Sequence, residues 1–423
     1  MGLRLGGILI LLALGTLVPA ARTGAQSTGA ADRDSVEARA ERLAAGLLPV
    51  VAALIGVSDY GPITIEARTK TELRTMITPL LREFYGEEAL RRRSRVSSAL
   101  GLVPPGYDLA AGYAELLIEV MGGGYDVFQQ KYYVLIDLPS AMADPAVQKM
   151  VAAHEITHAL QDQQRKIAGE MRRGATDWDY GFVCNAVTEG MAYQVMMAVA
   201  AGVPLAAAPD ATPMLAHTQA AMAASADFPA YARAPAYVRD MIFGPALSGL
   251  AFCRAYIADH ADHPAVDLLH QVPASGEQVL HYEKFVAGDL PFAIDLSTLD
   301  GRVPDTWQPF LAGSLGEFDL LALCAEHTAT RDSASTVAGG WDGCRFASYT
   351  TSGGDLVLLG LSAWDSARDA AEWSAGYARI LASCHGPERF AIEQAGHTVR
   401  FVIGPAATHR EMLALLATAS PAD

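Results

Sequence analysis

His154, Glu155 and His158 stand in the order His-Glu-x-x-His within an apolar, helix-favouring stretch. Residues four apart share one face of a helix, so both imidazoles could face a single cation. Glu155, beside the first histidine, could then take a proton from a water molecule held there. The pattern predicts a metal site that activates water, and Zn2+ is the usual ion of such sites. The alternative is a chance match on an ordinary amphipathic helix.

A catalytic zinc usually takes three protein ligands, and Glu189 is the leading candidate for the third. It is a lone carboxylate in an apolar stretch, where an unpaired buried charge is costly. The first helix would continue about nine residues past His158, or roughly 14 Å. Returning from Asp179 to Glu189 takes about ten residues, or roughly 15 Å. An antiparallel helix pair would therefore bring Glu189 level with His158.

Asp177 is the competing candidate for the third ligand, and Cys184 is a weaker one. The segment 174–181 resembles the Gly-Thr-x-Asp-x-x-Tyr-Gly segment of aspzincins, in which the aspartate is a ligand. Ala175 stands where that pattern has threonine. We expect Asp177 or Asp179 to cap the second helix instead, and Cys184 to be the weakest of the candidates.

The arrangement as a whole resembles the gluzincins, which are HExxH metallopeptidases with a downstream glutamate ligand. It is more closely similar to a set of exported bacterial proteins with an HExxHALQDQ helix, and this longer motif is far more specific than HExxH. The resemblance covers most of the chain after its first residues. The matching segments are His154–Gln163, Thr188–Gly190, Gly276–Phe285, Gly339–Gly343 and Ala363–Asp365.

This resemblance implies that His154, His158 and Glu189 are zinc ligands and that Glu155 is the general base. The chain departs from the family pattern at Cys344, where aspartate is expected, and at Tyr282, where proline is common. Both departures bear on the C-terminal part of the chain rather than on the zinc site.

Four other residues are candidates for supporting roles. Asp162 follows His158 by one turn and would either orient a ligand histidine or lie on a solvated face. His281 would either donate a hydrogen bond to the oxyanion of a hydrolytic reaction or be structural. Tyr125 and Tyr193 are weaker candidates for the oxyanion donor, and Tyr193 shares a helix face with Glu189.

An apolar run from Leu5 to Val18 follows Arg4, and small residues come after it. This is the pattern of a secretory signal peptide over residues 1–25. The run is short for a bilayer span of about twenty residues, although an uncleaved anchor is the alternative. We therefore expect a secreted or periplasmic protein with no membrane span in the mature chain.

Composition limits the partners. The 423 residues include 31 basic and 47 acidic ones, a formal charge of −16 that argues against nucleic acid. We expect the basic cluster 91–95 to be a solvated helix face. The five cysteines suit an exported protein with disulfides. We expect a Cys184–Cys253 bridge and a second one between two of Cys324, Cys344 and Cys384.

The predicted fold class is α+β, a mainly helical zincin-like domain with a small sheet, followed by a small α+β domain. We expect a flexible segment over 26–40, the first domain over 41–312 and the second over 313–423. A strand over 131–137 precedes the HExxH helix, and it would either bind substrate at a sheet edge or lie inside the sheet. The expected helices of the first domain are 71–85, 87–100, 110–121, 145–167, 179–200 and 241–257.

The second domain is expected to contain two β-hairpins separated by a helix. Its expected elements are a helix at 318–326, a hairpin at 345–351 and 355–362, a helix at 366–382, a hairpin at 389–394 and 398–403, and a helix at 410–417. No nucleophile or ligand cluster occurs in it. The sequence thus predicts an exported zinc-dependent hydrolase that acts on peptides or proteins. The alternative is an inactive zincin scaffold that serves as a binding protein of the cell envelope.

Overall fold

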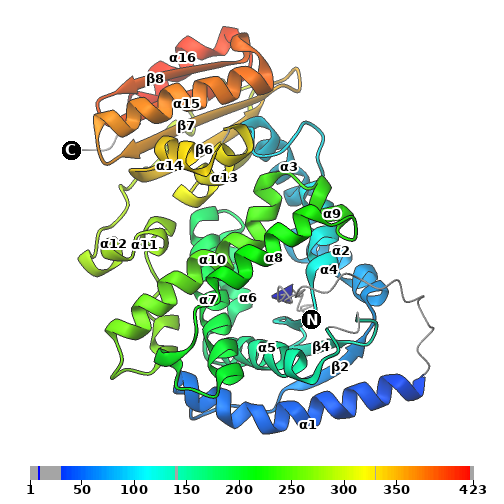
Figure 1. The fold of residues 1–423 in the computed structure, drawn as a ribbon. Coiled ribbons are helices and arrows are strands. Elements are labelled where there is room, and N and C mark those ends of the chain that lie inside the picture. The colour runs from blue at the N-terminus through cyan, green and yellow to red at the C-terminus, as the bar shows by residue number, and fades with distance from the viewer. Residues whose placement is uncertain (1–7, 10–29, 139–141, 329, 420–423) are drawn as a thin grey trace.

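The computed structural model describes residues 8–9, 30–138, 142–328 and 330–419, and it is mixed α+β. A helical region with a four-stranded sheet comes first, and a five-stranded sheet with its own helices follows (Figure 1). The helices of the first region are α1 Ala30–Ile55, α2 Lys70–Tyr85, α3 Glu87–Leu100, α4 Leu109–Val120, α5 Pro145–Arg165, α6 Ile167–Gly174, α7 Trp178–Ala201, α8 Thr212–Ala224, α9 Pro229–Arg233, α10 Ala236–Asp259, α11 Gly276–Leu280 and α12 Tyr282–Ala287. Its strands are β1 Ile8–Leu9, β2 Thr64–Arg68, β3 Gly123–Asp126 and β4 Lys131–Leu135.

Helix α1 replaces the flexible segment that was expected over 26–40, so that prediction is wrong from Ala30 onward. Its buried Val51 joins the apolar cluster that also holds Ile65 of β2. Arg33 pairs with Glu72 at 2.8 Å, which ties the beginning of the helix to α2. The predicted signal peptide lies outside the described residues, apart from Ile8 and Leu9 of β1.

The first sheet has the order β1-β3-β4-β2. Strand β4 pairs in parallel with β2 and antiparallel with β3, so it lies inside the sheet. The proposal of a substrate-binding edge over residues 132–137 is therefore wrong, because the sequence did not reveal β2. Strand β3 takes the position next to the edge, and the two residues of β1 pair antiparallel with its Tyr125 and Asp126.

Helices α5, α7 and α10 form the centre of the helical region (Figure 1). Asp144 caps α5 through the N–H of Ala146 at 2.8 Å, and Pro145 occupies the first turn, as predicted. The helix ends at Lys166, whose φ of 60° is left-handed. A separate helix, α6, follows where a loop was expected, because the N–H of Ile167 finds an acceptor in Asp162 at 3.0 Å.

Helices α7 and α10 cross with their backbones in contact. A Cβ atom on Gly190 would lie 2.1 Å from the carbonyl carbon of Gly249, and one on Gly249 would lie 1.8 Å from the carbonyl oxygen of Ala186. Both distances are far below van der Waals contact, so only glycine fits at these two positions. The crossing fixes the residue before Gly190, which is Glu189.

In the described part of the chain, α10 is long and apolar enough to cross a membrane, which was not expected from the sequence. More than half of its apolar stretch, 56%, is buried inside the protein. It packs along α7 and contributes to both apolar clusters of the helical region, for example through Phe243 and Phe252. These contacts are those of a core helix.

The second sheet is antiparallel throughout, with the order β5-β6-β7-β9-β8. Its predicted hairpins and helices are confirmed, but β5 and α14 were not foreseen, and β5 begins before the expected boundary at 313. The strands are β5 Gln308–Ser314, β6 Trp341–Thr350, β7 Leu356–Trp364, β8 Phe390–Ala395 and β9 Thr398–Ile403. The helices are α13 Glu317–His327, α14 Arg331–Ala338, α15 Ala367–His385 and α16 Ala406–Leu416.

The two regions share one apolar cluster. It extends from Leu117 of α4 and Phe243 of α10 to Trp364 of β7 and Phe401 of β9. The expected domains 41–312 and 313–423 therefore pack against each other through a common core. The cysteine predictions are also wrong, because all five cysteines are free thiols in the structure.

Candidate metal centre

Helix α5 places His154 and His158 on the same buried face, as the four-residue spacing predicts. Both side chains are completely buried, and their Nε2 atoms lie 2.8 Å apart. The two rings meet nearly edge to face, with centroids 4.6 Å apart. The two Nε2 atoms therefore converge on one point instead of facing solvent.

Glu189 reaches the same point from α7. One of its carboxylate oxygens lies 3.4 Å from His154 Nε2, and the other lies 3.6 Å from His158 Nε2. One ligand atom from each of the three residues lies within 4.8 Å of the others. Glu189 is thus the neighbour of the two histidines that the helix rises predict.

The competing third ligands lie elsewhere. Asp177 caps α7 through the N–H of Tyr180 and accepts a hydrogen bond from Ser314 at 2.7 Å. Asp179 is buried and accepts the N–H of Gly276 at 2.9 Å. Cys184 does not belong to the cluster either. Of the alternatives, only the capping role of Asp177 is confirmed.

Several buried polar atoms at this centre have no hydrogen-bond partner among the described residues. They include both carboxylate oxygens of Glu155, Oε2 of Glu189 and Nδ1 of His154. Unsatisfied buried polar groups are rare in folded proteins because each one costs free energy. A cation between the two imidazoles and Glu189 would satisfy the Glu189 carboxylate, and nitrogen and oxygen donors of this kind suit zinc. The residues present therefore fit such an ion.

Burial governs the protonation of these groups. It lowers the pKa of His158 to about 4 and that of His154 well below its usual value, so both rings are neutral near pH 7. A neutral imidazole is the form that binds a metal. Burial also raises the pKa of Glu189 to about 7. The pKa of Glu155 is raised by burial and then by Glu189, and the nearby backbone of Tyr125 on β3 opposes this shift.

Gln161, not Asp162, supports a ligand histidine. Its Oε1 accepts from His158 Nδ1 at 2.9 Å, and its amide donates to the Thr188 carbonyl at 3.0 Å. Gln161 thus fixes one ring and links α5 to the residue before Glu189. Asp162 accepts from Tyr125 Oη at 3.2 Å and from Ile167 N at 3.0 Å, and it is buried. Both predicted alternatives for it, a contact with a ligand and a place on a solvated face, are therefore wrong.

Two of the predicted oxyanion donors are engaged elsewhere, and the third, Tyr193, lies beside a ligand histidine. His281 bonds to Glu317 at 3.0 Å and is 41% exposed, which favours its structural role. Tyr125 Oη is engaged with Asp162. Tyr193 packs its ring edge to face on His154, with centroids 4.8 Å apart.

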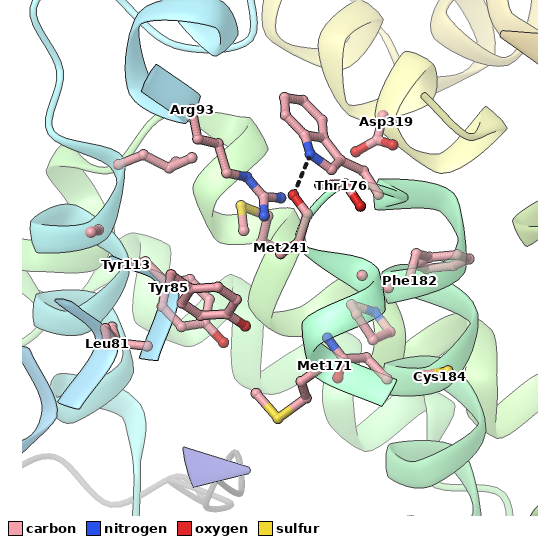
Figure 2. A pocket seen from close by; sticks show the side chains of 18 of the residues that line it. Leu81, Tyr85, Arg93, Tyr113, Met171, Thr176, Phe182, Cys184, Met241 and Asp319 are labelled. Atoms are coloured by element: carbon pink, nitrogen blue, oxygen red, sulfur yellow. Dashed lines mark hydrogen bonds between the residues drawn. The ribbon is translucent and has the colours of Figure 1, made fainter. Parts of the chain in front are cut away.

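A cavity of about 260 Å³ has Glu189 in its wall. Its lining is mostly apolar and comes from α2, α3, α4, α6, α7, α10, β5 and α13. Figure 2 shows the side chains of Tyr85, Tyr113, Arg93 and Met241 around this space. The part of the chain after residue 308 contributes Leu311 and Phe318, so both regions enclose the cavity.

Three residues of the metal centre and the cavity were not predicted from the sequence. Arg93 was assigned to a solvated helix face, but it turns inward and stacks on the Trp178 ring, 4.5 Å from its centroid. Tyr113 gave no signal because its α4 helix is apolar on most sides. Gln161 could have been found, since it lies one turn after His158 on the same buried face of α5.

Comparison with known proteins gives one partial match. Residues 309–413 match the model of a domain of unknown function (DUF8575), which corresponds to the second sheet and its helices. No curated protein and no solved structure matches the chain.

Proposed function

We propose that the protein is an exported, zinc-dependent peptidase with a zincin-like catalytic region. The observation that carries this proposal is the convergence of His154, His158 and Glu189, with the unpartnered carboxylate of Glu155 buried beside them. Export rests on the signal-peptide pattern of residues 1–25.

His154, His158 and Glu189 would hold the zinc ion, which would leave a coordination position for water or substrate. Zinc bound there polarises a carbonyl group and makes water more acidic. Glu155 accepts the proton of the attacking water and then transfers it to the leaving amine. Its carboxylate is suited to this task because no hydrogen bond from the described residues engages it.

Strand β3 supports a peptide as the substrate. The backbone of its Tyr125 lies close to Glu155, and this strand pairs antiparallel with the two residues of β1. Cleavage of the predicted signal peptide 1–25 would remove β1, and an extended peptide could then pair with β3 in its place, with its scissile bond near Glu155. Tyr113 and Tyr193 are the candidate oxyanion donors, because Tyr113 lines the same cavity as Glu189 and Tyr193 packs on His154.

The test compares the wild type with Glu155→Gln, which removes the base and keeps the size of the side chain. Both proteins are loaded with zinc, their metal content is measured, and peptide-library cleavage is followed by mass spectrometry. We expect equal zinc content and a loss of activity of about 10²–10⁴-fold, as for the removal of a general base. Equal cleavage by both proteins, or none by either with zinc bound, would leave the inactive-scaffold alternative in its place.

A further inference from the structure

The cavity contains one positive charge that the proposed reaction does not use. Arg93 comes from α3, lines the cavity and is half-buried, and its Nε atom has no hydrogen-bond partner among the described residues. No carboxylate of the described chain lies within ion-pair distance of it, whereas its neighbours Arg91 and Arg92 both pair with Glu88. Arg93 is therefore an inward-facing cation without a salt bridge, in a protein of net charge −16.

The groups around Arg93 do not use up its donors. The guanidinium lies over the face of Trp178, and stacking of this kind leaves the N–H groups free at its edge. Tyr237 forms a hydrogen bond with Arg93, but a guanidinium has five N–H donors, so others remain. Asp319 is a carboxyl group of the cavity wall, but its two oxygens accept from Tyr237 Oη at 2.9 Å and from Gly316 N at 3.0 Å. Burial also raises the pKa of Asp319 to about 6, which weakens its charge near neutral pH.

Much of the remaining wall is apolar, although Tyr85 and Tyr113 also line the cavity. Leu90, Met241 and Leu311 line the same cavity, and Figure 2 shows Arg93 and Met241 close together in it. A planar guanidinium in such surroundings binds a carboxylate through paired hydrogen bonds. Charge-assisted bonds of this type are stronger when water is excluded.

We propose that this cavity is the specificity pocket for the substrate and that Arg93 binds a substrate carboxylate there. The inference rests on the proposed function and names its substrate class: a peptide segment that is mainly apolar and carries one carboxylate. The carboxylate belongs either to an acidic side chain or to the chain terminus. Because the cavity is near the lower end of ligand-pocket volumes, a narrow extended segment fits it and a folded domain does not.

The structure also gives the approximate spacing in the substrate. Arg93 stacks on Trp178 in the first turn of α7, and Glu189 follows Trp178 by eleven positions in the same helix. At about 1.5 Å per residue this is roughly 16 Å along the helix axis. An extended peptide covers that length with about five residues. The recognised carboxylate therefore lies about five residues from the cleaved bond.

The experiment uses zinc-loaded full-length protein and quenched octapeptides of alanine and leucine. One glutamate or one glutamine occupies each position in turn, and each peptide is made with a free and with an amidated C-terminus. For the wild type we expect a preference for glutamate about five residues from the cleaved bond, or for the free terminus at that distance. Arg93→Gln should lower kcat/KM for the preferred peptide by about 10–100-fold and leave the glutamine or amidated partner within about threefold.

Arg91→Gln is the matched control, since Arg91 lies two residues away on α3, is exposed and pairs only with Glu88. It should keep the wild-type preference. An unchanged glutamate-to-glutamine ratio in Arg93→Gln would overturn the proposal, even if all peptides are cleaved. Binding of the same peptides to Glu155→Gln, measured by calorimetry, separates this result from a failure of the peptidase proposal. Loss of the carboxylate preference in Glu155→Gln/Arg93→Gln supports the pocket whether or not cleavage occurs.

Discussion

The helical region and the second sheet differ in how they treat buried polar groups. Around α5 and α7, the histidines, Glu155 and Glu189 are buried with several unpartnered atoms. In the second sheet and its helices, the buried atoms without a partner belong to Trp341, Trp373 and Arg400, and none of them is a carboxylate or an imidazole. The core there is mainly apolar, and Trp373 stacks between Trp364 and Tyr377. Proteins keep unsatisfied buried groups mainly where function requires them. The difference supports placing the proposed chemistry in the helical region instead of the second sheet.

The largest expected effect tests whether the two regions also unfold separately. Trp373→Ala should lower the free energy of unfolding by about 3–5 kcal/mol, because it empties a fully buried aromatic site. Since one apolar cluster joins both regions, the helices should unfold in the same transition. Thermal unfolding followed by far-ultraviolet circular dichroism, which is dominated by the helices, measures this. A helical transition that stays at the wild-type temperature would show that the regions are independent.

The next prediction tests which residue of the helical region orients a ligand histidine. Gln161→Leu should weaken zinc binding by about 10–100-fold, as expected when a residue that orients a metal ligand is lost. Asp162→Asn is the matched control, because Asp162 contacts Tyr125 and Ile167 instead of a ligand. Zinc affinity is measured by competition with a chelating dye. Equal affinity losses in the two variants would contradict the role given to Gln161.

The smallest effect concerns the boundary between the regions. The hydrogen bond to Glu317 raises the pKa of His281 above its usual 6.5, so folding favours the protonated ring. This contribution to stability is fully present below about pH 6.5 and is lost as the pH rises through the folded-state pKa. His281→Gln should therefore destabilise the protein more at pH 5.5 than at pH 9, by a small amount because the ring is partly exposed. Urea unfolding at the two pH values measures this, and a larger loss at pH 9 would contradict it.

Local signals explain most of what the sequence revealed. The spacing of His154 and His158 and the two helix rises were enough to bring Glu189 to them. Helices with clear caps, such as α5 and α7, were found with nearly correct ends. Strand β2 was missed because it depends on a tertiary partner, β4. Helix α6 was missed because it begins directly after α5, where Asp162 of α5 accepts the N–H of Ile167.

The site residues that could not be predicted depend on the direction in which a side chain points. Arg93 stands among arginines that are solvated, and nothing in its sequence neighbourhood separates it from them. Only the packing of α3 against the cavity turns it toward Trp178. His281 shows the opposite case, since a motif suggested chemistry and the fold gave it a partner in Glu317.

The contact between α7 and α10 has a consequence for ion selectivity. At Gly190 and Gly249 the two backbones are in direct contact, with no side chains between them. Helix α7 therefore cannot move toward α10, and Glu189 cannot move away from the two histidines in that direction. An ion larger than zinc needs longer bonds to its ligands, and Glu189 could provide them only if the whole of α7 moved. We therefore expect the centre to discriminate by size, accepting ions close to zinc in radius and rejecting calcium.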